Sequence, residues 1–289
     1  MKASVVTPNY NGKEFLKTYF DSLNRNKDFV GEVILVDNGS TDESIEFIKD
    51  YSRNLDFPVI IIRNAENLGF AKAVNQGILK SSYPYIFSLN NDTQVEESGI
   101  KPLIDLISSD DGIFSVASKM VQFDNKKLID DAGDEYNILA WTKKTGENQP
   151  AENYDEVYEI FSSCAGAAMY NKAILEKIGL FDENFFAYME DVDKNIFCPD
   201  SVVYHIGSAT SGSRYNKFKV KLAARNNVWT VYKNFPIPQK ILNFIFLFLG
   251  FLIKYLFFVK KGFGKTYLEG IKEGLKTRNK INKVKFSKK

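Results

Sequence analysis

The chain has 289 residues, of which 44% are hydrophobic and 26% are charged, so its composition is that of an ordinary globular protein. This length holds one large α/β domain, or one domain with an appendage. Its two cysteines, Cys164 and Cys198, lack CxxC spacing and are interpreted as buried thiols in a reducing compartment.

The net charge of +2 conceals two regions of opposite sign. Residues 233–289 contain 14 Lys or Arg and two Glu, which leaves 24 basic and 34 acidic residues in the rest of the chain. A strongly basic tail on an acidic body indicates an anionic partner, either a membrane or a nucleic acid. The N-terminal residues contain no apolar stretch long enough for a signal peptide, so we expect the body of the protein in the cytoplasm.

The first 120 residues alternate short β-rich runs with amphipathic helical runs. The predicted strands are 3–10, 32–37, 59–64, 85–92 and 113–121, and the predicted helices are 13–25, 43–52, 70–81 and 99–109. Strands that are apolar throughout and separated by helices predict an α/β fold, with a mostly parallel sheet covered by helices on both faces. Ser40 or Thr41 is predicted to cap the second helix.

The second half of the chain is less regular. Residues 122–160 are polar and weakly periodic, and we interpret them as a lid or an acceptor-side insertion. Residues 164–185 are predicted to form a small-residue strand followed by a helix, and a strand at 196–207 and a basic amphipathic helix at 216–235 come next. We expect one domain over residues 1–215 and a helical tail over 216–289.

The tail contains a 19-residue apolar run from Ile241 to Val259, interrupted by Asn243, Gly250 and Lys254. A membrane-spanning helix needs about 20 apolar residues, so the length leaves open whether this run spans a bilayer or lies at its surface. A helix buried in a dimer interface is the alternative. The many basic residues that follow favour attachment to an anionic membrane surface.

Polar residues gather where four of the predicted strands end, at Thr7–Asn11, Asp37–Ser40, Arg63–Asn67 and Asn90–Thr93. In parallel α/β sheets, ligands bind at the carboxyl ends of the strands. The positions indicate a nucleotide-type site, although neither GxGxxG nor GxxxxGK[ST] is present.

Taken singly, the candidate residues have structural explanations. Asp92 can cap the helix that follows it, and Asp37 can be a turn aspartate. His205 is the only histidine of the chain, and a lone histidine is more often a structural hydrogen-bonding group than a ligand.

Together, six segments resemble the family 2 inverting glycosyltransferases of the GT-A fold, especially their rhamnosyltransferase-like branch. The segments are "SVVTPNYNG" (4–12), "EVILVDNGSTD" (32–42), "NLGFAKAVNQG" (67–77), "SLNNDT" (88–93), "FDENFFAYMEDVD" (181–193) and "CPDSVVYHIGSATSG" (198–212). They occur in the order of the family and cover about residues 3–215. The helical tail is also similar to that branch, whose members often act at membranes.

The resemblance implies a divalent metal, Mn²⁺ or Mg²⁺, that screens the diphosphate of a nucleotide sugar. The family's DxD motif reads Asn90-Asn91-Asp92 here, so Asp92 is the expected metal ligand and His205 matches a histidine that some relatives use. Imidazole suits Mn²⁺ better than Mg²⁺, which favours manganese.

The resemblance also implies a set of donor-binding residues. They are Thr7, Pro8, Asn9, Tyr10, Asp37, Asn38, Asn67, Gly69, Lys72, Asn90 and Asn91. Asp37 matches the acid that hydrogen-bonds a pyrimidine ring, and Asn90 is expected near the ribose or an outer-shell water. Where the commoner family pattern has an arginine, this chain has Val74, so Lys72 is assigned to the phosphates instead.

The catalytic base of the family matches Asp191, which would deprotonate the acceptor hydroxyl. Burial beside Phe186, Tyr188 and Met189 would raise the pKa of Asp191, as a base requires. Glu190 is expected to orient the acceptor or the sugar, and Asp193 to brace the helix.

Relatives continue from these acids into a helix, whereas here only Lys194 and Asn195 precede the next strand. About a dozen residues are therefore missing relative to the family, either through a true deletion or because a segment was not built. We favour the unbuilt segment, which predicts that the Asp193 carbonyl carbon and the Lys194 nitrogen lie farther apart than a peptide bond of about 1.33 Å.

The expected function is a metal-dependent inverting glycosyltransferase on the cytoplasmic membrane face. It would use a UDP- or dTDP-linked sugar, such as dTDP-rhamnose, and a lipid-linked or polysaccharide acceptor. Three alternatives remain. The first is a nucleotidyltransferase, which lacks support because "TPNYNGKEF" is not a Gly-rich phosphate loop. The others are a membrane-tethered scaffold or nucleic-acid binder, and a degenerate transferase that binds the donor without catalysis.

Overall fold

The computed structural model describes residues 1–185, 194–207, 215–281 and 283. The chain folds into two compact units, one formed by Met1–Glu135 with Lys144–Thr210 and the other by Tyr136–Lys143 with Ser211–Lys289. The domain boundary predicted from the sequence, at 215/216, leaves residues 136–143 outside the tail, whereas they belong to the second unit.

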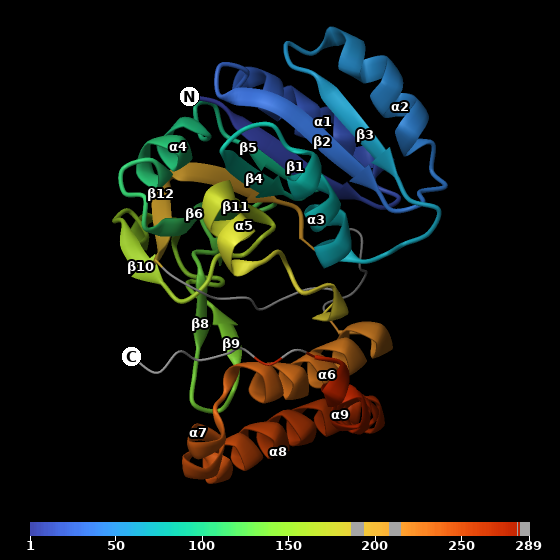
Figure 1. Ribbon diagram of the computed structural model, residues 1–289, viewed down its shortest axis with the longest axis vertical. Coiled ribbons are helices and arrows are strands. Elements are labelled where there is room, and N and C mark those ends of the chain that lie inside the picture. The colour runs from blue at the N-terminus through green and yellow to red at the C-terminus, as the bar shows by residue number, and fades with distance from the viewer. Residues whose placement is uncertain (186–193, 208–214, 282, 284–289) are drawn as a thin grey trace. The chain divides into compact units, whose positions relative to one another are not determined.

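The first unit is built on one twisted sheet (Figure 1). Its strands are β1 (Ala3–Asn9), β2 (Val30–Asp37), β3 (Val59–Arg63), β4 (Tyr85–Leu89), β5 (Thr93–Val95), β6 (Ile113–Gln122), β7 (Ile129–Asp131), β10 (Tyr158–Ile160), β11 (Ala167–Asn171) and β12 (Lys194–His205). The strand order is β10-β12-β6-β11-β4-β1-β2-β3, with β5 paired to β12 and β7 paired to β6.

Strands β3, β2, β1 and β4 run parallel to one another, so their carboxyl ends share one edge. The antiparallel strand β11 joins them to β6 and β12, which again run parallel to each other. The α/β class and the mostly parallel sheet predicted from the sequence are confirmed.

Alternation along the strands sends side chains to two hydrophobic layers. Val5 packs with helices α1 (Lys13–Arg25) and α4 (Lys101–Ile107) on one face. Its neighbour Val6 packs with α3 (Phe70–Lys80) and α5 (Lys172–Ile178) on the other (Figure 1). Both faces are therefore covered, which explains why these strands are apolar at nearly every position.

Helix α2 (Ser44–Tyr51) follows β2 and begins differently from the prediction. Its N-cap residue is Glu43, and its first turn is tied down by Asp42, whose Oδ1 accepts from the Ser44 backbone nitrogen at 3.2 Å. The predicted cap at Ser40 or Thr41 is wrong because the Ser40 backbone N–H and hydroxyl are both used by the Asp37 carboxylate.

The region expected as a lid contains short elements. Strand β7 pairs with β6 and β10 pairs with β12, while β8 (Asp134–Tyr136) and β9 (Thr142–Lys144) pair with each other in a separate two-stranded sheet, and the 3₁₀ turn η2 (Ala151–Asn153) lies between β9 and β10 in the chain. Ile129 and Ala132 form a small core with Phe197 and Val121. This packing places β7 directly alongside β6.

The second unit contains helices α6 (Lys217–Asn234), α7 (Ile237–Leu242), α8 (Phe244–Lys260) and α9 (Gly264–Thr277). Short 3₁₀ turns complete the described elements: η1 (Ser52–Asn54), η3 (Glu183–Phe185) and η4 (Arg278–Lys280). Helix α9 packs along both α6 and α8, with Tyr267 buried between Val220 and Phe258. Among the described residues, no helix combines the length and the apolar character needed to cross a membrane.

Candidate functional site

The carboxyl ends of β1, β2 and β4 are joined by buried amide and carboxylate side chains. Asn9 and Asp37 face each other at the ends of β1 and β2, and Asn9 Nδ2 donates to Asp37 Oδ1 at 2.9 Å. Asn91, in the turn after β4, donates from Nδ2 to Asn9 Oδ1 at 2.7 Å. The three side chains therefore form one chain of hydrogen bonds along the edge predicted to bind a ligand.

Asp37 also shapes the turn that follows β2. Its Oδ2 accepts the Ser40 backbone N–H at 3.0 Å, and its Oδ1 accepts the Ser40 hydroxyl. Ser40 Oγ in turn accepts the backbone N–H of Asn11 at 2.8 Å. Asp37 is fully buried, and its carboxylate holds the turns after β1 and β2 together through these hydrogen bonds. Its contact with a pyrimidine stays a prediction.

The loop after β1 presents Tyr10 outward rather than Thr7. Thr7 is fully buried and its hydroxyl is hydrogen-bonded to Tyr19, while Pro8 is half-buried and Tyr10 is 37% exposed. Among residues 7–10, which were assigned to donor binding, Tyr10 therefore has the side chain most accessible to a base or ribose.

The hydrogen bond between Asn9 and Asn91 requires a glycine at position 12, which was not predicted from the sequence. A Cβ atom on Gly12 would lie 2.0 Å from Asn91 Nδ2 and 2.9 Å from Asn9 Oδ1. Real Cβ atoms do not approach that closely, so the amide pair needs glycine here. The glycine of "YNG" was the available signal.

The turn before α3 is held by a second amide network. Asn38 Nδ2 donates to the Gly69 carbonyl at 3.2 Å, and the Gly69 N–H donates to Asn67 Oδ1 at 3.0 Å. Lys72 is half-buried and forms no ion pair with the described part of the chain. Val74 is fully buried among the apolar side chains of β1, β2 and α3, so its position cannot supply a surface cation.

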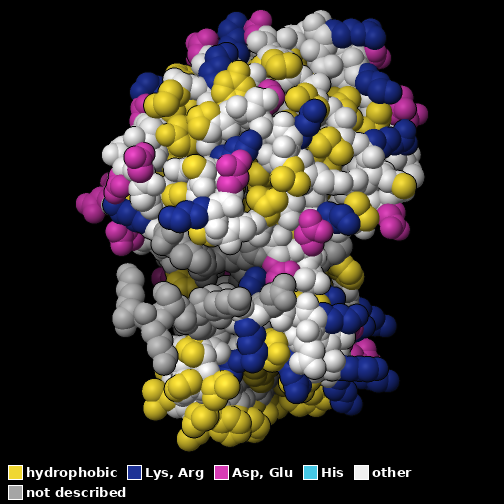
Figure 2. Space-filling model, in the orientation of Figure 1, with side chains coloured by type: hydrophobic (Ala, Val, Ile, Leu, Met, Phe, Trp, Pro, Cys, Tyr) yellow, Lys and Arg dark blue, Asp and Glu magenta, His cyan; other side chains and the backbone are white. Residues whose placement is uncertain are grey.

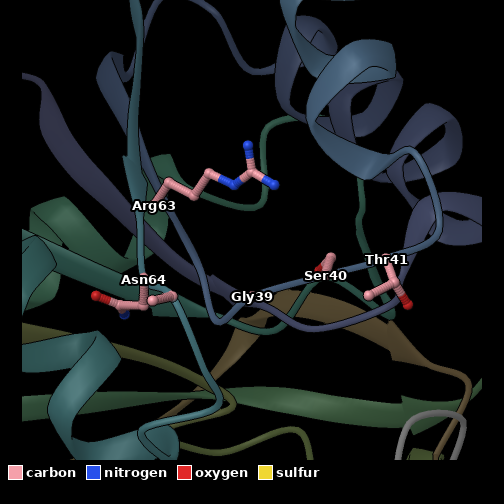
Figure 3. Close-up of a pocket in the computed structure, with 6 residues that line it drawn as sticks. Gly39, Ser40, Thr41, Arg63 and Asn64 are labelled. Atoms are coloured by element: carbon pink, nitrogen blue, oxygen red, sulfur yellow. The ribbon is translucent and has the colours of Figure 1, made fainter.

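A cavity of about 440 Å³ opens between the β2–α2 turn and the end of β3. It is lined by Gly39, Ser40, Thr41, Arg63, Asn64 and Ala65. Figure 3 shows Arg63 on one side and Ser40 and Thr41 on the other. The exposed Arg63 makes no ion pair with the residues that the structure describes. Sequence reasoning noted this strand end but did not identify Arg63 as a candidate anion-binding residue.

Asp92 and His205 meet because β5 pairs antiparallel with the end of β12. Thr93 lies opposite His205 in this pairing, and the Ile206 N–H donates to the Asp92 carbonyl at 3.1 Å. The His205 Nε2 atom is 3.6 Å from Asp92 Oδ1. That distance exceeds a good hydrogen bond, and the buried Asp92 Oδ1 has no hydrogen-bond partner.

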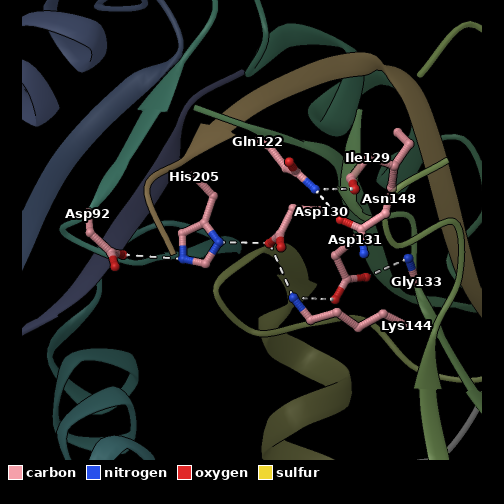
Figure 4. Close-up of polar contacts among 9 residues, drawn as sticks. All are labelled: Asp92, Gln122, Ile129, Asp130, Asp131, Gly133, Lys144, Asn148 and His205. Atoms are coloured by element: carbon pink, nitrogen blue, oxygen red, sulfur yellow. Dashed lines mark hydrogen bonds and ion pairs between the residues drawn. The ribbon is translucent and has the colours of Figure 1, made fainter. Parts of the chain in front are cut away.

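His205 is held from its other side by Asp130, which sequence reasoning missed (Figure 4). Strand β6 pairs with both β12 and β7, which brings the two residues together from positions 75 apart in sequence. The His205 Nδ1 to Asp130 Oδ2 distance is 2.7 Å, and Lys144 Nζ lies 3.2 Å from the same oxygen.

Burial disfavours the imidazolium of His205, but the Asp130 hydrogen bond and the Asp92 carboxylate outweigh it and raise its pKa to about 9. Burial likewise opposes ionisation of Asp130. The hydrogen bond from His205 and the charge of Lys144 nevertheless hold the pKa of Asp130 below its usual value.

Two further acids, the buried Asp131 and the half-buried Asp134, adjoin this cluster. Burial and the nearby Asp134 carboxylate raise the pKa of Asp131 to about 7, and burial raises the pKa of Asp134 to about 6. Asp131 Oδ1 accepts the Gly133 N–H at 2.8 Å, and its Oδ2 lies 3.7 Å from Lys144 Nζ. The hydrogen bond from Gly133 to Asp131 supports the turn between β7 and β8.

The Asp92–His205 pair has the donor set for part of a divalent-cation site. The orphaned Asp92 Oδ1 supplies an oxygen ligand and His205 Nε2 a nitrogen ligand, a combination that suits manganese. Within the described ranges, no group of three or more His, Cys, Asp or Glu side chains is placed to hold a metal. The protein residues in view therefore fit a metal that takes its other ligands from substrate or water.

The predicted catalytic acids Glu190 and Asp191 lie outside the described residues, as does Asp193. The predicted break between Asp193 and Lys194 therefore falls outside them as well. Asn90 lies at the sheet edge with its backbone tied to Gly166 and Thr93.

The sequence also matches a known protein family. The family model described as "Glycosyl transferase family 2" matches residues 4–179, which is more than half of the chain. The chain belongs to this family. Its fold is of the GT-A type.

This family 2 glycosyltransferase is similar to curated relatives over short segments. It is 43% identical over 79 residues to an uncharacterized glycosyltransferase, YfnE, of Bacillus subtilis, covering 27% of this chain and 20% of the relative. It is 36% identical over 66 residues to poly-beta-1,6-N-acetyl-D-glucosamine synthase of Staphylococcus epidermidis, covering 23% and 16%. The matches thus span a fifth or less of these relatives' length.

Its fold is similar to that of GalNAc-T7, solved with UDP, GalNAc and Mn²⁺. The TM-score is 0.65 at 19% identity, over 80% of this glycosyltransferase and 47% of GalNAc-T7. At this identity the likeness establishes the fold alone.

Proposed function

We propose that this glycosyltransferase is metal-dependent and moves a sugar from a nucleoside diphosphate donor to a saccharide or lipid-linked acceptor, with inversion at the anomeric carbon. The observation that carries the proposal is that the buried Asp92 Oδ1 has no hydrogen-bond partner and lies 3.6 Å from His205 Nε2. Both atoms lie in the unit that also holds the Asn9–Asp37–Asn91 edge and the Arg63 cavity.

Asp92 and His205 would hold the metal, Mn²⁺ in preference to Mg²⁺. When bound, a divalent cation supplies charge neutralisation for the diphosphate leaving group. The chain's own part is to fix the two ligands. Asp130 orients the imidazole, and the β5–β12 pairing sets the position of Asp92.

The donor base is proposed to be a pyrimidine, either uracil or thymine. The cavity beside Arg63 is a suitable place for part of the nucleotide, because it offers hydroxyl, amide and guanidinium groups. Tyr10 would lie against the base or ribose. GalNAc-T7, whose fold is similar, was solved with UDP, while the rhamnosyltransferase-like motifs favour dTDP-rhamnose.

In the proposed step, an acceptor hydroxyl oxygen bonds to the anomeric carbon as the bond from that carbon to the diphosphate oxygen breaks. The hydroxyl proton passes to the carboxylate of Asp191, and the nucleoside diphosphate leaves with the bonding electrons. Glu190 is proposed to orient the acceptor. The relative that makes a poly-N-acetylglucosamine supports a polysaccharide-type acceptor.

The first test is thermal unfolding of the purified chain with UDP, dTDP or GDP, each with and without Mn²⁺ or Mg²⁺. A ligand at about 100 times its dissociation constant stabilises the native state by about 2.7 kcal/mol. We expect a metal-dependent shift with one pyrimidine nucleotide, abolished by Asp92→Asn and retained by the exposed control Asp111→Asn. Equal shifts with and without metal would contradict the assignment of Asp92.

The second test is release of nucleoside diphosphate from UDP- and dTDP-sugars, with the product anomer assigned by NMR. Turnover that is lost in Asp191→Asn supports the proposed base. Metal-dependent binding with no turnover on any donor or acceptor tried would instead support a nucleotide-sugar-binding protein without transferase chemistry.

A further inference from the structure

Helices α7 and α8 present an apolar face to solvent (Figure 2). In the part of the chain that the structure describes, 13 of the 23 exposed large hydrophobic side chains lie on these two helices. Phe244, Phe248, Leu252, Leu256 and Val259 recur at helical spacing along the outer face of α8. A contiguous exposed apolar face of this kind marks an interaction surface.

The opposite face of α8 is already occupied within the second unit. Leu247 and Gly250 are buried, and Phe251, Tyr255 and Phe258 pack towards Tyr267 of α9. Trp141 Nε1 donates to the Gly250 carbonyl at 3.2 Å. A Cβ on Gly250 would lie 2.3 Å from the Leu139 carbonyl oxygen, so glycine permits this close approach. One face of α8 thus packs within the second unit, and the other face is exposed to solvent.

The charges of this unit are almost all positive. Residues 136–143 and 211–289 contain 20 Lys or Arg and two acidic residues, which leaves 18 basic and 34 acidic residues in the other unit. Lys260, Lys261 and Lys265 are exposed where α8 turns into α9, and they form no ion pair with the described residues. Lys261 Nζ lies 5.9 Å from the centre of the Phe257 ring, so a cation adjoins the apolar face directly.

We propose that the α7–α8 face binds an anionic membrane surface, with α8 lying in the plane of the interface rather than crossing the bilayer. Aromatic and aliphatic side chains flanked by lysines suit the boundary between acyl chains and anionic headgroups. A second copy of the chain is a poorer occupant, because pairing two such faces would bring unpaired lysines of the same sign together.

The in-plane orientation follows from the packing of α8. To cross a bilayer, α8 would have to leave α9, which carries Lys265, Glu269, Lys272 and Glu273, or draw these charges into hydrocarbon. It would also lose the Trp141 hydrogen bond and the core around Tyr267. Lying in the interface keeps all of these contacts and buries only the free face.

The first experiment is flotation of the purified full chain with phosphatidylcholine vesicles, prepared with or without phosphatidylglycerol as the anionic lipid. We expect binding to the anionic vesicles that weakens in high salt. Phe248→Glu with Leu256→Glu should lower binding at least ~10-fold. The matched control, Leu79→Glu with Val157→Glu, adds the same charge at exposed sites of the other unit and should bind as the unaltered chain.

Depth is tested with single cysteines at the two ends of the face, Gln239→Cys and Lys261→Cys, both at exposed positions. With vesicle-bound protein and a membrane-impermeant maleimide outside, both sites should react. The unaltered chain gives the background from Cys164 and Cys198. Protection of one site and not the other would overturn the in-plane orientation.

Two results would overturn the membrane assignment itself. One is vesicle binding that is equal in the Phe248/Leu256 variant and its parent. The other is absence of vesicle binding together with a dimer that this variant converts to monomer, which would make the face an interface between copies. Metal-dependent nucleotide shifts measured on the same variants keep this test separate from that of the proposed function.

Discussion

The Nδ1 atom of His205 donates a hydrogen bond to Asp130 Oδ2 at 2.7 Å, and this fixes which ring nitrogen faces Asp92. A histidine ligand commonly has its second nitrogen held in this way by a carboxylate, which sets the tautomer and the orientation of the ring. Asp130 thus acts through His205 and touches no substrate in the proposed scheme. It is a positioning residue.

Asp130→Ala is expected to weaken Mn²⁺ binding by about 10- to 100-fold, the usual effect of removing such a supporting carboxylate. The measurement is a Mn²⁺ titration of the nucleotide-dependent thermal shift. The exposed control Asp124→Ala should leave the titration unchanged. An unaltered Mn²⁺ midpoint in Asp130→Ala would show that the hydrogen bond is structural only.

The single histidine of the chain gives this prediction a second readout. In ¹⁵N-histidine NMR spectra with Mg²⁺ and nucleotide bound, the proton should reside on Nδ1. Asp130→Ala should shift the ring towards a mixture of tautomers because the acceptor for Nδ1–H is gone. Identical nitrogen shifts in both proteins would contradict the positioning role.

The buried acids near Lys144 predict a pH dependence of stability. The folded pKa of Asp131 is raised to about 7 by burial and by Asp134, so between pH 4 and 7 the folded chain binds a proton that the unfolded chain releases. Stability therefore falls as pH rises through this window. Asp131→Asn should make the fall shallower by up to about 1.4 kcal/mol per pH unit, the value for one proton.

This slope is best measured by urea unfolding between pH 4.5 and 6, with Asp124→Asn as the exposed control. The window lies below the range in which His205 titrates, since its pKa is raised to about 9 from an ordinary value of 6.5. If Asp131→Asn and the unaltered chain keep parallel slopes, Asp131 is ionised in the folded state and the assignment fails.

Gly12→Ala should disrupt the strand-end network by steric overlap. The new Cβ would lie 2.0 Å from Asn91 Nδ2, so Asn91 must leave Asn9 or the loop must move. Overpacking of this kind costs about 1–3 kcal/mol of stability. Urea unfolding measures this, and nucleotide affinity should fall as well. Gly112→Ala meets only the flexible Asp110 side chain, at 3.3 Å, and serves as the control. Equal effects of the two substitutions would count against the network.

Arg63→Ala should weaken nucleotide binding if the cavity beside it receives part of the donor. Loss of a hydrogen bond to a charged group costs about 1.5–3 kcal/mol, or roughly 10- to 150-fold in affinity. Calorimetric titration with UDP and with uridine separates a phosphate contact from a base contact. Arg53→Ala removes an exposed arginine elsewhere and should have no effect.

The order of elements in the first unit was predictable because its signals are local. The helix predicted at 13–25 is observed as Lys13–Arg25, and the strand predicted from residue 59 is observed as Val59–Arg63. Both depend on apolar periodicity and on glycine or polar residues at the ends. The polar strand ends also predicted where Asn9, Asp37 and Asn91 would meet.

What the sequence did not reveal depends on pairing between distant segments. Asp130 lies in a polar region with no periodic signal, and only the shared pairing of β7 and β12 with β6 brings it to His205. The cap of α2 was mispredicted because Ser40 bonds to Asp37 instead of to the helix. Competing side-chain partners of this kind are invisible in a local pattern.

The eight residues from Tyr136 to Lys143 belong to the second unit although they are encoded in the middle of the first. A gene fragment that starts at residue 211 would therefore produce the helices without Trp141 and Leu139, the residues that meet Gly250. A fragment that stops at residue 210 would leave Trp141 without its helix. Exchange of the tail between related genes thus requires both segments to be exchanged together, so we expect residues 136–143 and α8 to be inherited as a matched pair.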